Sequence, residues 1–211
     1  MNDRVEELRA RIGALQVQLE QEYEARRARI RHRIENGRVI WEDGVRRSHL
    51  ALRQRIPAFL RNSSVRYTIT APVIYSLIIP FALLDLFVSA YQAICFPAYR
   101  IPKVRRADYI RIDRHQLAYL NWIQKLNCVY CGYCNGLIAY VREISARTEA
   151  FWCPIKHAMR ASGTHPYHDH FSDYGDAQNF RPEWEASRAR MQALNCEALK
   201  CDKCAGGDRD E

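Results

Sequence analysis

The residues best suited to chemistry are two short pairs of sulfur and nitrogen ligands in the second half of the chain. Cys128 and Cys131 form a C-x2-C pair, and after 21 intervening residues Cys153 and His157 form a C-x3-H pair. Thiolate and imidazole groups in two close pairs are typical of tetrahedral zinc and iron sites. The spacing therefore predicts a metal centre with four ligands: Cys128, Cys131, Cys153 and His157.

The residues next to these pairs fit a metal site. Gly132 follows Cys131 directly and leaves room where the backbone turns its amides toward sulfur. Pro154 begins a helical turn after Cys153, and positions i and i+4 of such a turn share a face. Three thiolates and one imidazole suit structural zinc, but they would also hold a mononuclear iron or an iron–sulfur cluster. Inert buried thiols and a redox-active dithiol are the alternatives.

Two weaker clusters contain further ligand types. One is a C-x4-C-x2-C spacing in the acidic tail, formed by Cys196, Cys201 and Cys204. Cys134 would complete a second four-ligand site with them. The other cluster combines histidines and aspartates: His165, His168, Asp169, His170, Asp173 and Asp176. Metal ligation would explain it, but the composition favours an exposed polar loop. Cys95 is interpreted as a packing residue.

Longer motifs extend over the stretch from about Val65 to Ala158: YQAICFP, IPKVRRADYI, LNCVYCGY, NGLIAYVREISART and FWCPIKHA. With these motifs the chain resembles a family of bacterial membrane-associated proteins of similar length. The resemblance implies a cytoplasmic protein attached to a membrane, with the Cys/His set intact, and it brings no established activity. Family members usually have a small residue at position 134, so Cys134 is a departure. The two ligand pairs also resemble, locally, the metal knuckles of rubredoxins and zinc ribbons.

Helices are expected to position the two ligand pairs. One helix begins after a capping Asp113 and carries apolar residues at three-four spacing: Leu117, Leu120, Ile123 and Leu126. A second helical pattern runs from Leu137 to Ile155. Asn135 and Gly136 predict a break between them, so the ligand pairs would meet at the ends of a helical hairpin. The fold class is therefore mainly α, with metal binding coupled to the folding of two helices.

The N-terminal part is expected to be a polar helical arm. Its first residues are charged and lack a continuous apolar core, so no signal peptide is expected. Apolar residues at helical spacing predict an amphipathic helix: Val5, Leu8, Ile12, Leu15, Leu19, Tyr23, Ile30 and Ile34. It would end near Asn36-Gly37, and it would form a coiled coil or pack on its own protein. A second basic helix is expected from about Val45 to Leu60.

Residues 67–99 are almost entirely apolar and contain one charge, Asp85. A straight helix of this length would measure about 50 Å, whereas the hydrocarbon core of a bilayer is about 30 Å thick. Pro80 lies near the middle, so a helical hairpin bent there, which re-enters or spans the membrane, is the leading model. A tilted single span and a buried hairpin in a soluble core are the alternatives.

Asp85 would lie deep in the membrane in either membrane model. Ionisable residues at such a depth are costly and mark functional candidates. The apolar segment has no second ionisable group that could pair with it. A protonated or helix-capping Asp85 near the bend is therefore favoured.

Basic residues cluster on both sides of the apolar segment. Residues 1–66 carry 15 basic against 9 acidic residues, and residues 100–160 carry 11 against 4, whereas residues 161–211 carry 6 against 10. Such collars fit anionic lipid headgroups, and an arginine-rich solvated surface is the alternative. The chain has no recognisable nucleic-acid-binding module, so nucleic acid is not expected as a partner.

Four segments summarise the expected organisation: a helical arm at 1–66, a membrane-associated hairpin at 67–99, a Cys/His metal domain at 100–160 and an acidic tail with one helix at 161–211. The sequence contains no recognisable catalytic or nucleotide-binding motif, so it predicts no particular enzymatic reaction. The leading hypothesis is a metal-binding assembly platform on the cytoplasmic membrane, with its Cys/His domain facing the cytoplasm. Its N-terminal helix would mediate self-association or partner contact. The alternatives are an electron-transfer protein with iron at the same ligands and a basic zinc module for nucleic acid.

Overall fold

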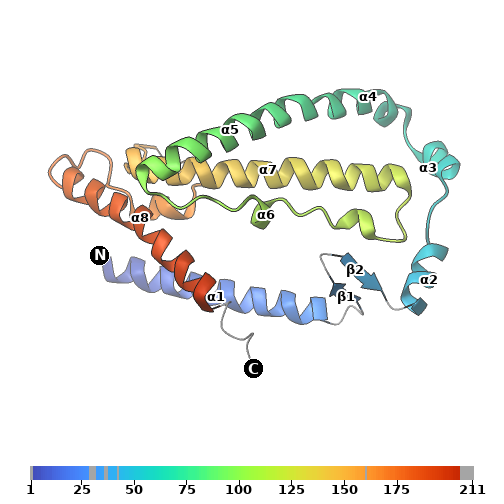
Figure 1. Cartoon of the computed structure of the whole chain (residues 1–211), viewed down its shortest axis with the longest axis horizontal. Coiled ribbons are helices and arrows are strands. Elements are labelled where there is room, and N and C mark those ends of the chain that lie inside the picture. The colour runs from blue at the N-terminus through green and yellow to red at the C-terminus, as the bar shows by residue number, and fades with distance from the viewer. Residues whose placement is uncertain (1, 29–31, 36–37, 42, 160, 205–211) are drawn as a thin grey trace. The chain divides into compact units, whose positions relative to one another are not determined.

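The computed structural model describes residues 2–28, 32–35, 38–41, 43–159 and 161–204 (Figure 1). This part of the chain is mainly helical, as predicted, and its one sheet is a two-stranded hairpin. The contacts between residues divide the chain into two compact units. Unit 1 comprises residues 1–60 and 113–125, and unit 2 comprises residues 61–112 and 126–211.

Unit 1 begins with a helix that is shorter than predicted. α1 is Asn2–Ala28, and β1 (His32–Glu35) and β2 (Arg38–Trp41) then form an antiparallel hairpin. The prediction of one helix up to Asn36-Gly37 is therefore wrong from His32 onward, and the predicted cap lies outside the described residues. Asn-Gly is a preferred dipeptide for two-residue hairpin connections, so the sequence contains a strand signal at this point.

The second basic helix is divided in two. α2 is Asp43–Ala51 and α3 is Ile56–Asn62. Pro57 explains why one helix from Val45 to Leu60 does not form. Its ring would clash with the carbonyl of Arg53 in a continuous helix, and it has no N–H to donate to that carbonyl. Proline fits instead in the first turn of α3.

The helix predicted after Asp113 begins later than expected. A short 3-10 helix, η1, covers Arg114–Gln116, and the next α-helix, α7, starts at Trp122. Asn121 Oδ1 accepts a hydrogen bond from the Gln124 N–H at 3.0 Å, and Gln124 Oε1 accepts one from the Asn121 N–H at 2.9 Å. This reciprocal pair is a capping box, so Asn121 and not Asp113 defines the start of the helix.

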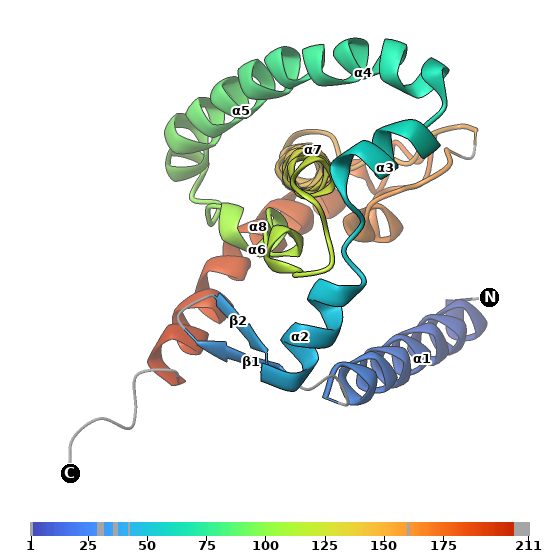
Figure 2. The ribbon, with the colours of Figure 1, turned by 90° about the vertical axis from the view of Figure 1, so that its right-hand side faces the viewer.

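Unit 2 opens with the apolar segment, which forms α4 (Val65–Ser76) and α5 (Ile78–Tyr99). Figure 2 shows the two helices as one arch that curves over α7. Pro80 accounts for the interruption at Leu77, because it lacks the N–H that would bond the Ser76 carbonyl and its ring clashes there. The chain bends at this point but does not reverse. The predicted hairpin is therefore wrong, because α4 and α5 continue in the same general direction. The tilted single span stays a prediction.

A charged connector follows α5. It spans residues 100–112 and contains one helical turn, α6 (Arg106–Tyr109). The connector runs back beside α7, on the side away from the α4–α5 arch (Figure 1). The core of unit 2 lies where α5, the connector, α7 and the C-terminal part meet: Phe96, Ile101, Val104, Leu137, Tyr140, Ile144, Ala150, Phe151, Phe171 and Met191.

α7 is one uninterrupted helix, Trp122–Trp152, so the predicted break at Asn135 and Gly136 is wrong. A Cβ added to Gly136 would lie 2.7 Å from the carbonyl oxygen of Tyr109 and 2.8 Å from Cα of Ile110. The glycine thus allows the connector to approach the helix closely. Asn135 stays within the helix, where its side-chain amide donates to the carbonyl of Cys131 at 3.0 Å.

The C-terminal part confirms the predicted tail helix and closes the end of α7. A 3-10 helix, η2 (Pro166–His170), precedes α8 (Phe180–Cys204). Ser187 Oγ donates to the Ala150 carbonyl at 2.7 Å, and Trp184 Nε1 donates to the Phe151 carbonyl at 3.0 Å. The last carbonyls of an α-helix have no partner within the helix. Side chains of α8 therefore satisfy those of α7.

Candidate functional site

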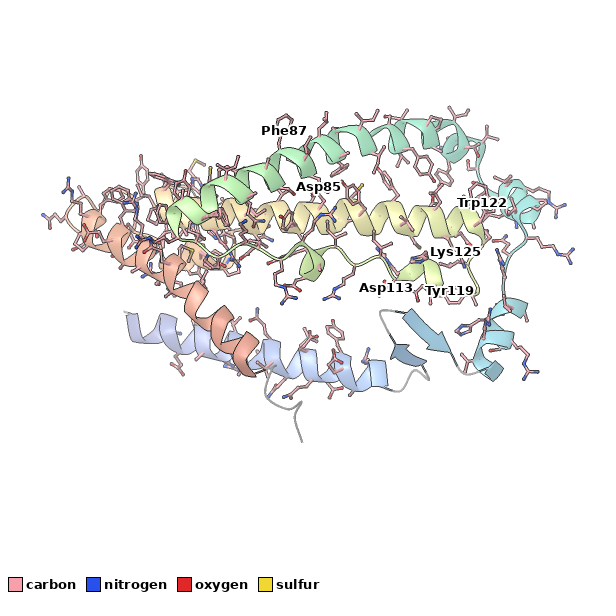
Figure 3. The ribbon with its side chains drawn as sticks, viewed as in Figure 1. Asp85, Phe87, Asp113, Tyr119, Trp122 and Lys125 are labelled. Carbon is pink, nitrogen blue, oxygen red and sulfur yellow. The ribbon has the colours of Figure 1, made fainter. Side chains whose placement is uncertain are left out.

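One side of α4 and α5 is an apolar surface that the rest of unit 2 leaves exposed. Phe87 is 69% exposed and Ile94 is 73% exposed. Figure 3 shows Phe87 pointing away from α7, whereas Asp85 points toward it. The exposed apolar residues of this side are together named the outward face: Ile69, Val73, Ile79, Leu83, Leu86, Phe87 and Ile94. The outward face carries no charge, because Asp85 is the one charged residue between Tyr67 and Tyr99.

Behind the outward face, Asp85 is held by residues of the connector and of α7. Its Oδ2 accepts a hydrogen bond from Arg106 Nη2 at 2.5 Å and one from the Tyr133 hydroxyl at 3.0 Å. Burial, together with the bond to Asp85, raises the pKa of Tyr133, so its hydroxyl keeps the proton that it donates. The expectation of a protonated or capping Asp85 without a charged partner is therefore wrong.

A second polar contact joins α5 to the start of the connector. The side chain of Gln92 is buried, and its Oε1 accepts a hydrogen bond from the Val104 N–H at 2.6 Å. Its Nε2 donates to the Tyr140 hydroxyl of α7 at 2.8 Å. Because the amide satisfies groups of two other segments, it fixes the position of α5 on the core.

Contacts along α7 show that it runs parallel to α4 and α5. At one end the Tyr130 hydroxyl donates to the Ile74 carbonyl at 2.7 Å. At the other end the Tyr91 and Thr148 hydroxyls lie 3.0 Å apart. Residue numbers rise in the same direction in both helices, so the inward side of the apolar helices follows α7 along most of its length.

A groove of about 570 Å³ lies between α5 and α7. Its lining is mostly apolar, with a few polar groups: Phe87, Val88, Tyr91, Ile144, Ser145, Thr148, Glu149 and Trp152. Phe87 belongs both to the groove and to the outward face. The groove therefore continues the apolar surface toward α7.

The four predicted metal ligands lie at two distant points. Cys128 and Cys131 are in the first half of α7, whereas Cys153 directly follows its last residue. The helix between Cys131 and Cys153 holds them about 33 Å apart, because each residue adds 1.5 Å to its length. Cys131 and Cys153 are exposed and Cys128 is half-buried. The structure therefore does not bring the four ligands together within one chain.

His157 lies among other histidines. Its ring stacks on that of His168 with centroids 6.1 Å apart, and the rings of His165 and His168 are 6.2 Å apart. His165 Nε2 lies 2.9 Å from Glu149 Oε2 of α7. In the part of the chain that the structure describes, no three His, Cys, Asp or Glu side chains form a group that could hold a metal ion.

The aspartates of the polar cluster have structural partners. Asp173 Oδ1 lies 2.7 Å from Lys156 Nζ. Asp176 accepts hydrogen bonds from the backbone N–H of Asn179 at 3.2 Å and from its side-chain amide at 2.9 Å. These bonds lower the pKa of the Asp176 carboxyl. They order the loop that leads into α8, whose first residue follows Asn179.

The proposed second cysteine site is only partly described. The backbone of Cys196, Cys201 and Cys204 lies in α8, and their side chains lie outside the described part of the chain. Cys134 is buried on α7, and burial raises the pKa of its thiol. A thiol in this state is a poor metal ligand and a poor nucleophile.

Sequence reasoning missed the two residues that hold the apolar helix in place. Arg106 is one of several basic residues after the apolar segment, and no spacing distinguishes it from its neighbour Arg105. Gln92 carries a stronger signal, because an amide within such an apolar segment needs hydrogen-bond partners. That signal predicts a buried polar contact without naming the partner.

The chain matches no protein-family model, no curated protein and no solved structure. Val65–Tyr99 is the one helix among the described residues that is long and apolar enough to cross a membrane.

Proposed function

We propose that this chain is a helical platform that attaches to a membrane through the outward face and presents its remaining surface to protein partners. One observation carries the proposal: seven exposed apolar side chains follow the length of α4 and α5 without a charge among them. Contiguous exposed apolar surface of this kind marks sites of membrane or protein contact. Asp85 and Gln92 are directed away from this face and fasten the helix to the core.

Exposed basic residues near both ends of the apolar helix support a lipid partner. Arg61 and Arg66 lie at its N-terminal end, and Arg100, Lys103 and Arg105 follow its C-terminal end. Each such residue contributes about 1 kcal/mol to binding when it lies close to an anionic membrane surface. Nucleic-acid binding would give no reason for these basic residues to flank an apolar helix, so their position favours lipid as the partner.

α1 is the part of the proposed platform that contacts protein. Leu8, Ile12, Leu15 and Leu19 are each more than half exposed, and unit 1 leaves them uncovered. Self-association through this stripe would bury them. Leu15→Glu should weaken self-association in sedimentation velocity, whereas Val17→Glu, equally exposed but on the opposite side of α1, should not. Equal behaviour of both variants would contradict this role.

A single zinc or iron centre is not part of the proposal. Metal binding by Cys128, Cys131, Cys153 and His157 stays a prediction from the sequence. In the observed geometry it requires ligands from two copies of the chain, because α7 keeps the two pairs apart. Electron transfer through iron at these residues has the same requirement.

The membrane proposal is tested by flotation of the full chain with vesicles of phosphatidylcholine and phosphatidylglycerol. The paired change Leu83→Asp and Phe87→Asp places charge on the outward face, and it should lower the bound fraction by at least about tenfold. Met159→Asp is the matched control, since Met159 is 84% exposed outside the outward face. Binding that survives the paired change, or that is lost equally in the control, would overturn the proposal.

A further inference from the structure

The connector returns along the helices that carry the outward face. Val104 pairs with Gln92, and two residues later Arg106 pairs with Asp85. Further along, Tyr109 and Ile110 lie against Gly136. As residue numbers rise along the connector, those of its partners on α5 fall. The connector is therefore antiparallel to α5 and contacts it from beside α7.

This return path bears on how a bilayer can accommodate the apolar helix. The connector carries exposed charged side chains, among them Lys103, Arg105 and Arg111. It is also irregular outside the single turn of α6. If α4 and α5 crossed the bilayer with this packing, the connector would cross it beside them. Exposed charges and irregular backbone are both costly in hydrocarbon.

The second half of α7 leads to the same conclusion. It holds four charged residues within eight positions: Arg142, Glu143, Arg147 and Glu149. They lie beside the C-terminal half of α5, where Tyr91 meets Thr148. A transbilayer α5 would carry this charged stretch into the membrane with it. The length of the helix adds to the argument, because 35 residues measure about 50 Å and a bilayer core about 30 Å.

We infer that α4 and α5 lie along the plane of the membrane, with the outward face in the hydrocarbon of one leaflet. The inference rests on the proposed function, since it describes how the same face meets lipid. An in-plane helix normally keeps its second side polar and wet. Here that side is covered by α7 and contacted by the connector, whose charges then remain on the aqueous side of the leaflet.

The occupant of the outward face is lipid of an anionic leaflet. Arg66 and Arg100 are exposed at the two ends of the helix, so an in-plane orientation brings both to the headgroups of the same leaflet. A transbilayer orientation would place them at opposite surfaces. Arg66→Gln and Arg100→Gln should each lower affinity for phosphatidylglycerol vesicles by about fivefold. Neither change should affect binding to vesicles of phosphatidylcholine alone.

Depth measurements test the orientation directly. An environment-sensitive fluorescent amino acid, incorporated by codon suppression at Ile69, Ile79, Phe87 or Ile94, is quenched with lipids brominated at different acyl positions. The in-plane orientation predicts similar, shallow depths at all four positions. A transbilayer helix predicts that the probes at Ile79 and Phe87 lie deepest in the bilayer and that those at Ile69 and Ile94 lie closer to its surfaces. The same probe at Tyr174, which is 70% exposed away from these helices, should stay in water.

The side of the bilayer on which each end of the apolar helix lies gives the second readout. An azide-bearing amino acid at Asn62 or at Lys103, both exposed, is reacted with a membrane-impermeant alkyne outside sealed vesicles. The in-plane orientation predicts complete reaction at both positions without detergent. Protection of either position until detergent is added would overturn the inference.

The two proposals fail in different ways. A chain that does not float with vesicles, and whose four probes all report water, would refute membrane attachment itself. A chain that floats but shows the transbilayer depth profile would refute only the in-plane orientation. Circular dichroism of each variant confirms that its helix content is unchanged, so that misfolding is not scored as either outcome.

Discussion

Asp85 of α5 and Arg106 of α6 form an ion pair whose two side chains differ in exposure. Arg106 Nη2 lies 2.5 Å from Asp85 Oδ2, and the carboxylate side chain is 15% exposed whereas the guanidinium side chain is 49% exposed. The carboxylate therefore depends on its partner more than the guanidinium does. Water can solvate Arg106 alone, but it has little access to Asp85.

This asymmetry predicts unequal effects of breaking the pair. Arg106→Gln should lower the free energy of unfolding by about 2 kcal/mol, because it leaves a partly buried carboxylate without its cation. Tyr133 and Ser89 each donate a hydrogen bond to a different oxygen of Asp85. Asp85→Asn should cost about 1 kcal/mol, since the amide oxygen still accepts one of these bonds. The double variant should cost less than the sum. Chemical denaturation of the four proteins in detergent measures the cycle, and strictly additive effects would contradict a coupled pair.

The sequence predicted helices where apolar or amphipathic periodicity is strong, and it failed where a glycine or proline has more than one structural role. The sequence predicts a helix break at Gly136, but the glycine is needed where the connector packs against a continuous helix. The sequence predicts a chain reversal near Pro80, but proline in the first turn of α5 only bends the chain. Residue type alone does not distinguish these roles, because tertiary neighbours decide between them.

The predicted metal site depended on the same predicted helix break. The pairs Cys128–Cys131 and Cys153–His157 each have ligand spacing, but spacing within a pair says nothing about the distance between pairs. That distance depended on the break at Gly136, which does not occur. The outward face, in contrast, was predictable, because freedom from charge over a long segment is a property of the sequence itself.

Gly136 provides a stability test of this packing. Gly136→Ala should lower the free energy of unfolding by about 2 kcal/mol, because the added Cβ would lie 2.7 Å from the Tyr109 carbonyl oxygen and must displace the connector. Gly13→Ala is the control within α1, where a Cβ has nothing within 4 Å, and it should cost nothing. Thermal unfolding of both variants measures the difference. A stabilising Gly136→Ala would show that the connector does not pack against α7.

The cysteines of α7 should differ in reactivity. Cys131 is exposed, whereas Cys134 is buried and its thiol has a raised pKa because of that burial. Since the thiolate is the reacting species, Cys134 should be alkylated at least about tenfold more slowly than Cys131 near neutral pH. Time-resolved labelling with iodoacetamide, followed by peptide mass spectrometry, measures both rates in one sample. Equal rates in the folded protein would place α7 in a different orientation.

Chelation should leave the helices intact. The Asn121–Gln124 capping box holds one end of α7, and α8 side chains hold the other, so its folding does not require a metal ion. Addition of a strong zinc chelator should not change the helical signal in circular dichroism. Cys153→Ser should change the free energy of unfolding by less than about 0.5 kcal/mol, because Cys153 is exposed. Loss of helical signal on chelation would instead support the prediction that a metal ion holds these helices together.

Tyr167 predicts a loss of stability at alkaline pH. Its hydroxyl donates to Glu143 Oε1 at 2.7 Å, and burial together with this bond raises its pKa from 10.0 to about 12. The folded protein therefore holds the phenolic proton more tightly than the unfolded chain does. Its stabilising contribution is complete below about pH 10 and disappears as the pH rises through about 12. Because the phenol is only partly buried, we expect a loss of about 1 kcal/mol.

Comparison with Tyr167→Phe separates this group from the other tyrosines. The variant lacks the titrating phenol, so its free energy of unfolding should fall less steeply than that of the unmodified chain between about pH 9 and 12. At about pH 8 the variant should be less stable than the unmodified chain by about 1 kcal/mol, because it has lost the hydrogen bond to Glu143, and this difference should shrink as the pH rises. Urea denaturation at both ends of this range measures the difference. Parallel pH profiles would mean that Tyr167 titrates alike in the folded and unfolded states, and would thus refute its contact with Glu143.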